Sequence, residues 1–133
     1  MKIFIAVVLL FILVDIAIVA YVIYRRYRKK VPDNVKQSIR KSWKKIIQEA
    51  DYRHAIMDAD KLLDYALMNY GFKGNLGNKL KKSGHMFSNV NQVWAAHKIR
   101  NNLAHQIGYE IDKRLYKTTM LAFKQAFKDL KIF

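Results

Sequence analysis

An uninterrupted apolar stretch near the N-terminus limits what this chain can fold into more than any other feature. Residues 3–24 read IFIAVVLLFILVDIAIVAYVIY, and Asp15 is their only charged side chain. As a helix this stretch would be about 33 Å long, enough to cross a hydrocarbon core of roughly 30 Å. The sequence therefore predicts a transmembrane anchor over residues 1–24. Asp15 either contacts another helix in the membrane or is tolerated there in its protonated form, and the absence of a basic partner in the span favours the second interpretation.

A basic cluster follows the apolar stretch directly. Its members are Arg25, Arg26, Arg28, Lys29 and Lys30. Positive charge beside a membrane span stays on the cytoplasmic side, so we expect the N-terminus outside and the rest of the chain inside. A cleaved signal peptide is the alternative, but its apolar region would be shorter, roughly 7–15 residues, with no basic cluster behind it. We therefore predict a basic juxtamembrane linker over residues 25–34.

The positive charge of the chain lies almost entirely beyond the apolar stretch. Lysine and arginine number 25 against 10 acidic residues, for a net charge of +15, and Lys2 and Asp15 cancel within residues 1–24. Such a domain is attracted to polyanions, which means RNA or other nucleic acid on one interpretation and anionic membrane lipids on the other. The chain has no cysteine, which excludes disulfides and thiolate metal sites. Acidic residues cluster only on one expected helix, so we assign no metal and no cofactor.

The remainder of the chain has helical periodicity and no strand-like alternation. Apolar residues recur every three or four positions, as on the buried face of a helix. Helices are expected over residues 35–50, 52–70, 75–82, 90–105 and 113–130, with Asp33 or Asn34 capping the first, Gly71 ending the second and Asp112 capping the last. The predicted fold is all-α: an N-terminal transmembrane helix followed by an antiparallel bundle of four to five helices over residues 35–133.

The helix expected over residues 90–105 carries the clearest chemical pattern. His97, Arg100, Asn101 and His105 fall within an arc of about 140° on a helical wheel, opposite an apolar face. Histidine exchanges protons near neutral pH, and arginine binds phosphate oxygens with two parallel hydrogen bonds. RNA brings its own nucleophile, the 2′-OH. The pattern is typical of metal-independent phosphodiester chemistry, although a solvated helix face in a basic protein can carry the same residue types.

The segment Arg100-Asn101-Asn102-Leu103-Ala104-His105 resembles the signature of the HEPN superfamily, which is Arg, a polar residue, three further residues and His. HEPN domains are compact helical domains found in many RNases of toxin–antitoxin and antiviral systems. Residues 40–130 also resemble a group of small bacterial membrane proteins in which a transmembrane helix precedes such a domain. The residues that carry this second likeness include Trp43, the run 55–64, Gly71, Gly74, Leu80 and the run 94–105.

The resemblance implies a homodimer in which two long helices bring their Arg and His side chains to a shared cleft. Arg100 would hold the scissile phosphate, His105 would act on the 2′-OH or the leaving group, and Asn101 would position either of them. The products would be a 2′,3′-cyclic phosphate and a 5′-OH. His97 would support the site, and Asp60 would support it through an ion pair with Arg100, unless Asp60 is simply a solvated carboxylate. An antitoxin protein is a further implied partner, and the bacterial inner membrane is the implied location.

Two other functions compete with a ribonuclease or RNA-binding module. One is a non-catalytic dimeric scaffold that binds other proteins at the inner membrane. The other is a cationic membrane-active protein, which the sequence disfavours because the basic residues are spread over a folded domain instead of one amphipathic helix.

Overall fold

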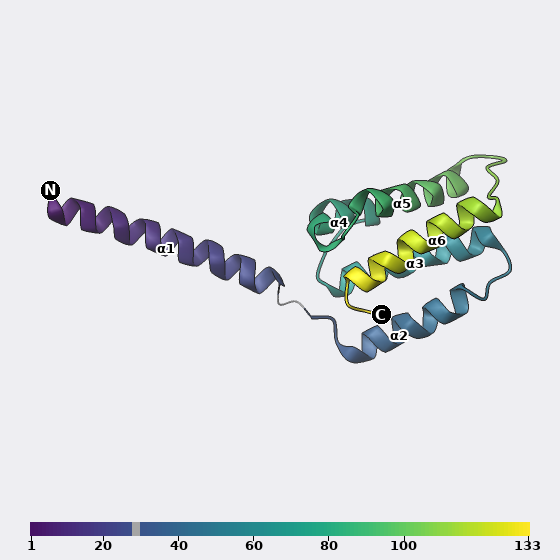
Figure 1. Ribbon diagram of the computed structural model, residues 1–133, viewed down its shortest axis with the longest axis horizontal. Coiled ribbons are helices and arrows are strands. Elements are labelled where there is room, and N and C mark those ends of the chain that lie inside the picture. Colours follow the sequence, from purple (N-terminus) through teal and green to yellow (C-terminus); the bar gives the residue numbers. More distant parts are fainter. Residues whose placement is uncertain (28–29) are drawn as a thin grey trace. The chain divides into compact units, whose positions relative to one another are not determined.

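The computed structural model describes residues 1–27 and 30–133 (Figure 1), so Arg28 and Lys29 of the basic cluster lie outside the described residues. Within these two ranges the chain forms six α-helices and one 3₁₀ turn, Gly84–Met86, and no β-strand. It divides into two compact units, Met1–Lys30 and Val31–Phe133. The prediction of an all-α fold is confirmed.

The first unit is one long apolar helix, α1 (Lys2–Tyr27). Its segment Lys2–Tyr24 is long and apolar enough to cross a membrane, and none of it is buried in the protein. A signal sequence near an N-terminus has the same properties. The helix also continues past Tyr24 into the region that we predicted to be a linker.

The second unit is a bundle of four longer helices and one short helix. They are α2 (Asp33–Ile46), α3 (Tyr52–Asn69), α4 (Leu76–Ser83), α5 (Val90–His105) and α6 (Lys113–Asp129). Consecutive long helices run in opposite directions, and α3 contacts each of the other four (Figure 1). The predicted antiparallel bundle is therefore confirmed, with α3 as its central helix.

Most helix ends are stabilised by the side chains that the sequence suggests. The Asp112 carboxylate accepts a hydrogen bond from the backbone N–H of Leu115, which confirms it as the N-cap of α6. Gly71 adopts a left-handed φ of +87° just after α3, and the N–H of Phe72 bonds back to the carbonyl of Leu67. This is the arrangement in which glycine ends a helix at low conformational cost.

The boundaries of α2 differ from the prediction at both ends. Pro32 occupies the N-cap position, with Asp33 already in the first turn, so the prediction that Asp33 or Asn34 caps this helix is wrong. Val31, predicted to lie in the linker, is only 2% exposed and belongs to the core. At the other end α2 stops at Ile46, four residues short of the predicted range, and Asp51 takes an extended backbone conformation and caps α3. Ile47 is consequently left half exposed.

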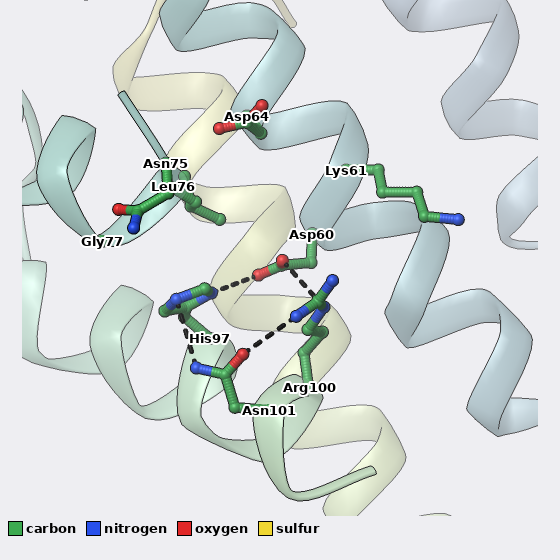
Figure 2. Close-up of a pocket in the computed structure, with 9 residues that line it drawn as sticks. All are labelled: Asp60, Lys61, Asp64, Asn75, Leu76, Gly77, His97, Arg100 and Asn101. Atoms are coloured by element: carbon green, nitrogen blue, oxygen red, sulfur yellow. Dashed lines mark hydrogen bonds and ion pairs between the residues drawn. The ribbon is translucent and has the colours of Figure 1, made fainter. Parts of the chain in front are cut away.

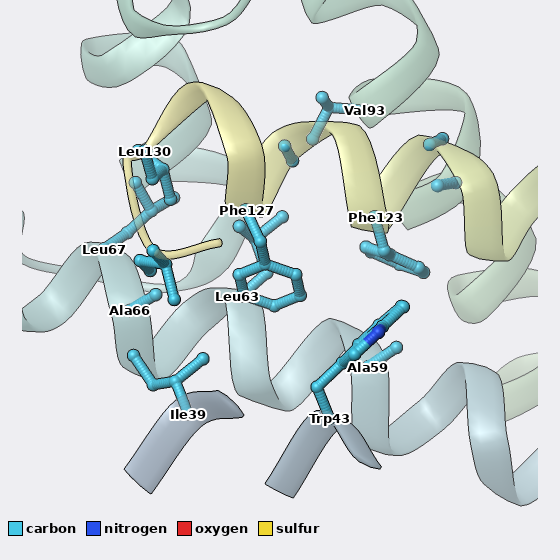
Figure 3. Close-up of a cluster of buried hydrophobic side chains, with 14 of the residues drawn as sticks. Ile39, Trp43, Ala59, Leu63, Ala66, Leu67, Val93, Phe123, Phe127 and Leu130 are labelled. Carbon is cyan, nitrogen blue, oxygen red and sulfur yellow. The ribbon is translucent and has the colours of Figure 1, made fainter. Parts of the chain in front are cut away.

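The core of the bundle is built from aromatic and aliphatic side chains that converge from α2, α3, α5 and α6 (Figure 3). Phe123 and Phe127 of α6 are fully buried, and the Trp43 ring meets Phe127 edge-on with centroids 5.4 Å apart. Each side chain of this size contributes about 1.5–3 kcal/mol when it is buried. Every buried hydrophobic residue described lies within residues 31–133. This unit therefore has its own core and needs no packing from α1 to fold.

Candidate functional site

Four polar side chains from two helices meet on the wall of a pocket of about 450 Å³ (Figure 2). Asp60 comes from α3, and His97, Arg100 and Asn101 come from α5. The three α5 residues are three and four positions apart, which places them on one face of the helix. Val93, Ala96 and Leu103 are the buried residues of the same helix. Val93 and Ala96 lie one turn before His97 and Arg100, so the polar residues border the buried face, where α5 contacts α3.

Asp60 is the centre of this group. It is 3% exposed, its Oδ1 lies 2.8 Å from Nδ1 of His97, and its Oδ2 lies 3.3 Å from Nε of Arg100. A buried carboxylate is costly unless cationic or donor groups compensate it, and here two such groups do. Asp60 is therefore not a solvated helix carboxylate, and it forms the ion pair with Arg100 that the sequence left open.

The four side chains form a closed ring of contacts. Arg100 donates from Nη1 to Oδ1 of Asn101 at 3.0 Å, and the Nδ2 amide of Asn101 lies 3.3 Å from Nε2 of His97. Because arginine only donates, the Asn101 oxygen must face Arg100, and its amide group must face His97. Nε2 of His97 then accepts, so the imidazole hydrogen is on Nδ1 and is donated to Asp60. The ring thus favours one tautomer of the His97 imidazole.

Arg100 is the least constrained member of the ring. Its Nε is buried and lies at ion-pair distance from Asp60 without the alignment of a hydrogen bond. The side chain as a whole is 26% exposed, and neither the contact with Asp60 nor the one with Asn101 uses Nη2. The guanidinium therefore has donor capacity left for an anion that enters the pocket.

The start of α4 forms another wall of the pocket, which is also lined by Lys61, Asp64, Asn75, Leu76 and Gly77. Lys79 of α4 is 4% exposed, and its Nζ lies 2.8 Å from Oδ1 of Asp64 and 3.3 Å from the Asp64 backbone carbonyl. This ion pair attaches α4 to α3 beside the Asp60 ring. Sequence analysis missed Lys79, although its place among Leu76, Leu80 and Ser83 on the buried face of a short helix was the available signal.

His105, the predicted catalytic histidine, lies apart from this group. It is the last residue of α5, is exposed to solvent and does not line the pocket. It lies five positions beyond Arg100, an axial distance of about 7.5 Å. Of the predicted site residues, the described chain thus brings together Arg100, Asn101, His97 and Asp60, and leaves His105 outside.

No protein-family model, curated protein or solved structure matches this chain. The likeness to HEPN domains accordingly rests on the motif residues themselves. Chemically, the pocket combines a partly exposed guanidinium with an imidazole whose Nδ1–H is held by a buried carboxylate. Such a pair can bind an oxyanion and exchange a proton with a group bound beside it.

Proposed function

We propose that this chain is a membrane-anchored domain that binds RNA and cleaves it without a metal ion. The observation that carries the proposal is the bonded group of Asp60, His97, Arg100 and Asn101 on the wall of an open pocket. A guanidinium next to an imidazole supplies the two functions that phosphodiester cleavage requires, which are binding of the negative phosphate and movement of a proton. The HEPN-like motif that begins at Arg100 suggests the same chemistry.

RNA is the favoured substrate because it carries its own nucleophile. Attack of the 2′-OH on the adjacent phosphorus yields a 2′,3′-cyclic phosphate and a 5′-OH, with no need for a metal-bound water. The net charge of +15, which lies in residues 25–133, supports binding to the phosphate backbone independently of base sequence. Affinity and cleavage should therefore weaken strongly as salt concentration rises.

The anchor would keep this activity at the cytoplasmic face of a bacterial inner membrane. α1 is the one apolar span found in residues 1–27 and 30–133, and the basic cluster after it favours an N-terminus outside and a bundle in the cytoplasm. Anionic lipids of the inner leaflet would then be a second polyanionic surface within reach of the basic domain. A cleaved signal sequence would instead release the domain on the other side, where cytoplasmic RNA is absent.

A homodimer is the proposed active form. An apolar groove of about 480 Å³ lies between α5 and α6, and Leu121 on its rim is 64% exposed. A second copy of the chain seated on this groove would cover Leu121 and Ile99, and would bring the α5 helices of two copies together as in HEPN dimers. The same groove favours the alternative function, a non-catalytic dimeric scaffold at the membrane, and an antitoxin protein would be a further partner in either case.

Cleavage of a labelled RNA in EDTA separates the enzyme from the scaffold. The full chain in detergent and the unit 31–133, which has its own core, should both yield fragments that end in a 2′,3′-cyclic phosphate. Arg100→Gln should lower the rate at least about 100-fold, since it removes the phosphate-binding group. The matched control is Arg114→Gln, which removes the same charge from an exposed position on α6. Intact RNA with the folded wild-type protein would reject the nuclease and leave the scaffold.

A further inference from the structure

His97 has the surroundings of a proton-transfer residue, and His105 does not. The His97 imidazole is 13% exposed, lines the pocket, and lies 2.8 Å from a carboxylate that is itself 5% exposed. The other ionisable residues that line this pocket are Lys61, Asp64 and Arg100. His105 is at the solvent-exposed end of α5 and is absent from the pocket wall.

We infer that His97 is the general base of the site and that Asp60 is its positioning residue. The inference rests on the proposed RNA cleavage and assigns the proton transfer to a histidine outside the HEPN-like motif. Donation of Nδ1–H to Asp60 leaves the lone pair on Nε2, the nitrogen that faces away from α3 toward Asn101. The buried carboxylate also stabilises the imidazolium that forms when Nε2 accepts a proton, as an aspartate does in Asp–His pairs of hydrolases.

Asn101 connects this base to the phosphate-binding arginine. Its amide contacts Nε2 of His97 at 3.3 Å, a long distance for a hydrogen bond, and its oxygen accepts from Nη1 of Arg100. A phosphate oxygen can bind Nη2 of Arg100, which neither the Asp60 nor the Asn101 contact uses, so the Arg100–Asn101 bond stays in place. The 2′-OH reaches Nε2 by displacing the Asn101 amide from its long contact with that nitrogen. Asn101 thus sets the phosphate-binding group and the base side by side.

The reaction balances without a co-reactant. Nε2 of His97 takes the proton from the 2′-OH while the 2′-oxygen forms a bond to phosphorus. The bond from phosphorus to the 5′-oxygen breaks, and that oxygen takes up one proton from solvent. His97 then returns its own proton to solvent, which restores the neutral imidazole. One phosphodiester becomes a cyclic phosphate and a hydroxyl group, with no net gain or loss of atoms.

The first test compares two histidine variants of the full chain in detergent, with cleavage of a labelled RNA in EDTA followed from pH 5 to pH 9. His97→Gln keeps a side-chain donor for Asp60 but removes the base, so we expect a rate loss of at least about 100-fold and no acidic limb in the pH profile. His105→Gln should keep both the rate and the acidic limb. The opposite result, with cleavage lost in His105→Gln and kept in His97→Gln, would overturn the assignment and leave the ribonuclease in place.

The second test needs no substrate. Long-range ¹H–¹⁵N correlation spectra of the ¹⁵N-labelled chain, with the His97 signals assigned from His97→Gln, report which ring nitrogen carries the hydrogen. We expect the Nδ1–H tautomer in the wild type above pH 7.5 and its loss in Asp60→Asn. An Nε2–H tautomer in the wild type would refute the role of His97 even if RNA is cleaved. A wild-type protein with the expected tautomer that cuts no RNA would refute the proposed function, and the assignment of His97 with it.

Discussion

Two carboxylates one turn apart on α3 are used in opposite ways. Asp64 is 38% exposed and pairs with Lys79, whose side chain is only 5% exposed, so the cation is the buried partner. The Asp60 side chain is 5% exposed and pairs with Arg100, whose side chain is 26% exposed, so here the anion is the buried partner. The two ion pairs are similar in composition, but the buried partner is the cation in one and the anion in the other.

This inversion separates a structural contact from a candidate site. A buried lysine can reach no ligand, and the Lys79–Asp64 pair serves only to attach the start of α4 to α3. A buried aspartate, in contrast, holds Arg100 and His97 at the rim of the pocket, where both can contact a ligand that enters. An ion pair alone does not make a phosphate-binding site. Burial of the anion does, because it leaves the cationic partner at the pocket wall.

The largest predicted effect is on the pair with the buried cation. Asp64→Ala strands the ammonium of Lys79 inside the protein, so we expect a loss of about 3 kcal/mol in the free energy of unfolding. Lys79→Met keeps the buried aliphatic chain and leaves Asp64 free to be hydrated, so it should change stability by less than about 1 kcal/mol. Urea unfolding of residues 31–133, followed by circular dichroism, measures both. Equal losses in the two variants would show that the direction of burial does not matter.

A smaller effect is predicted for the pair with the buried anion, because Asp60 has two partners. Arg100→Ala and His97→Ala should each cost about 1 kcal/mol, since the remaining partner still compensates the carboxylate. The double variant leaves Asp60 without either and should lose at least about 1 kcal/mol more than the sum of the single losses. The same urea measurement gives the coupling energy. Strict additivity would mean that the two contacts do not share one buried charge.

Much of the fold was predictable because it depends on local patterns. The 3.6-residue periodicity identified α3, α5 and α6, and Gly71 and Asp112 marked helix ends through their own backbone preferences. The N-cap of α2 was not predictable in this way. Asp33 and Asn34 are both good caps, but Val31 is buried in the core and Pro32 occupies the cap position. Tertiary packing decided between nearly equal local choices.

The site was predictable to the extent that it lies on one helix. His97, Arg100 and Asn101 share a face of α5, and a helical wheel is enough to group them. The wheel also included His105, because a wheel gives the angle of a residue around the helix axis and not its position along that axis. It does not show that the pocket ends before the end of α5. The contribution of Asp60 depends on how α3 packs against α5, which no pattern within a single helix contains. The place of Lys79 on the buried face of α4 indicated its burial, but not its partner Asp64 on α3.

The smallest predicted effect concerns acid stability and a third carboxylate, Asp129 of α6. Partial burial raises the pKa of Asp129, but hydrogen bonds from the backbone N–H of Ser88, from Gln125 and from the Ser88 hydroxyl, together with the charge of Lys131, outweigh it and lower the pKa overall. A carboxylate whose pKa is lower in the folded state stabilises the protein above its unfolded pKa, near pH 4, and loses this contribution as pH falls through the folded pKa.

Asp129→Asn should therefore be slightly less stable than the wild type at pH 7 and equally stable near pH 2, with the difference disappearing below about pH 4. Urea midpoints measured from pH 2 to pH 7 would show this convergence. A stability difference between wild type and Asp129→Asn that is constant with pH would show that the Ser88 contacts act through packing and not through the charge of the carboxylate.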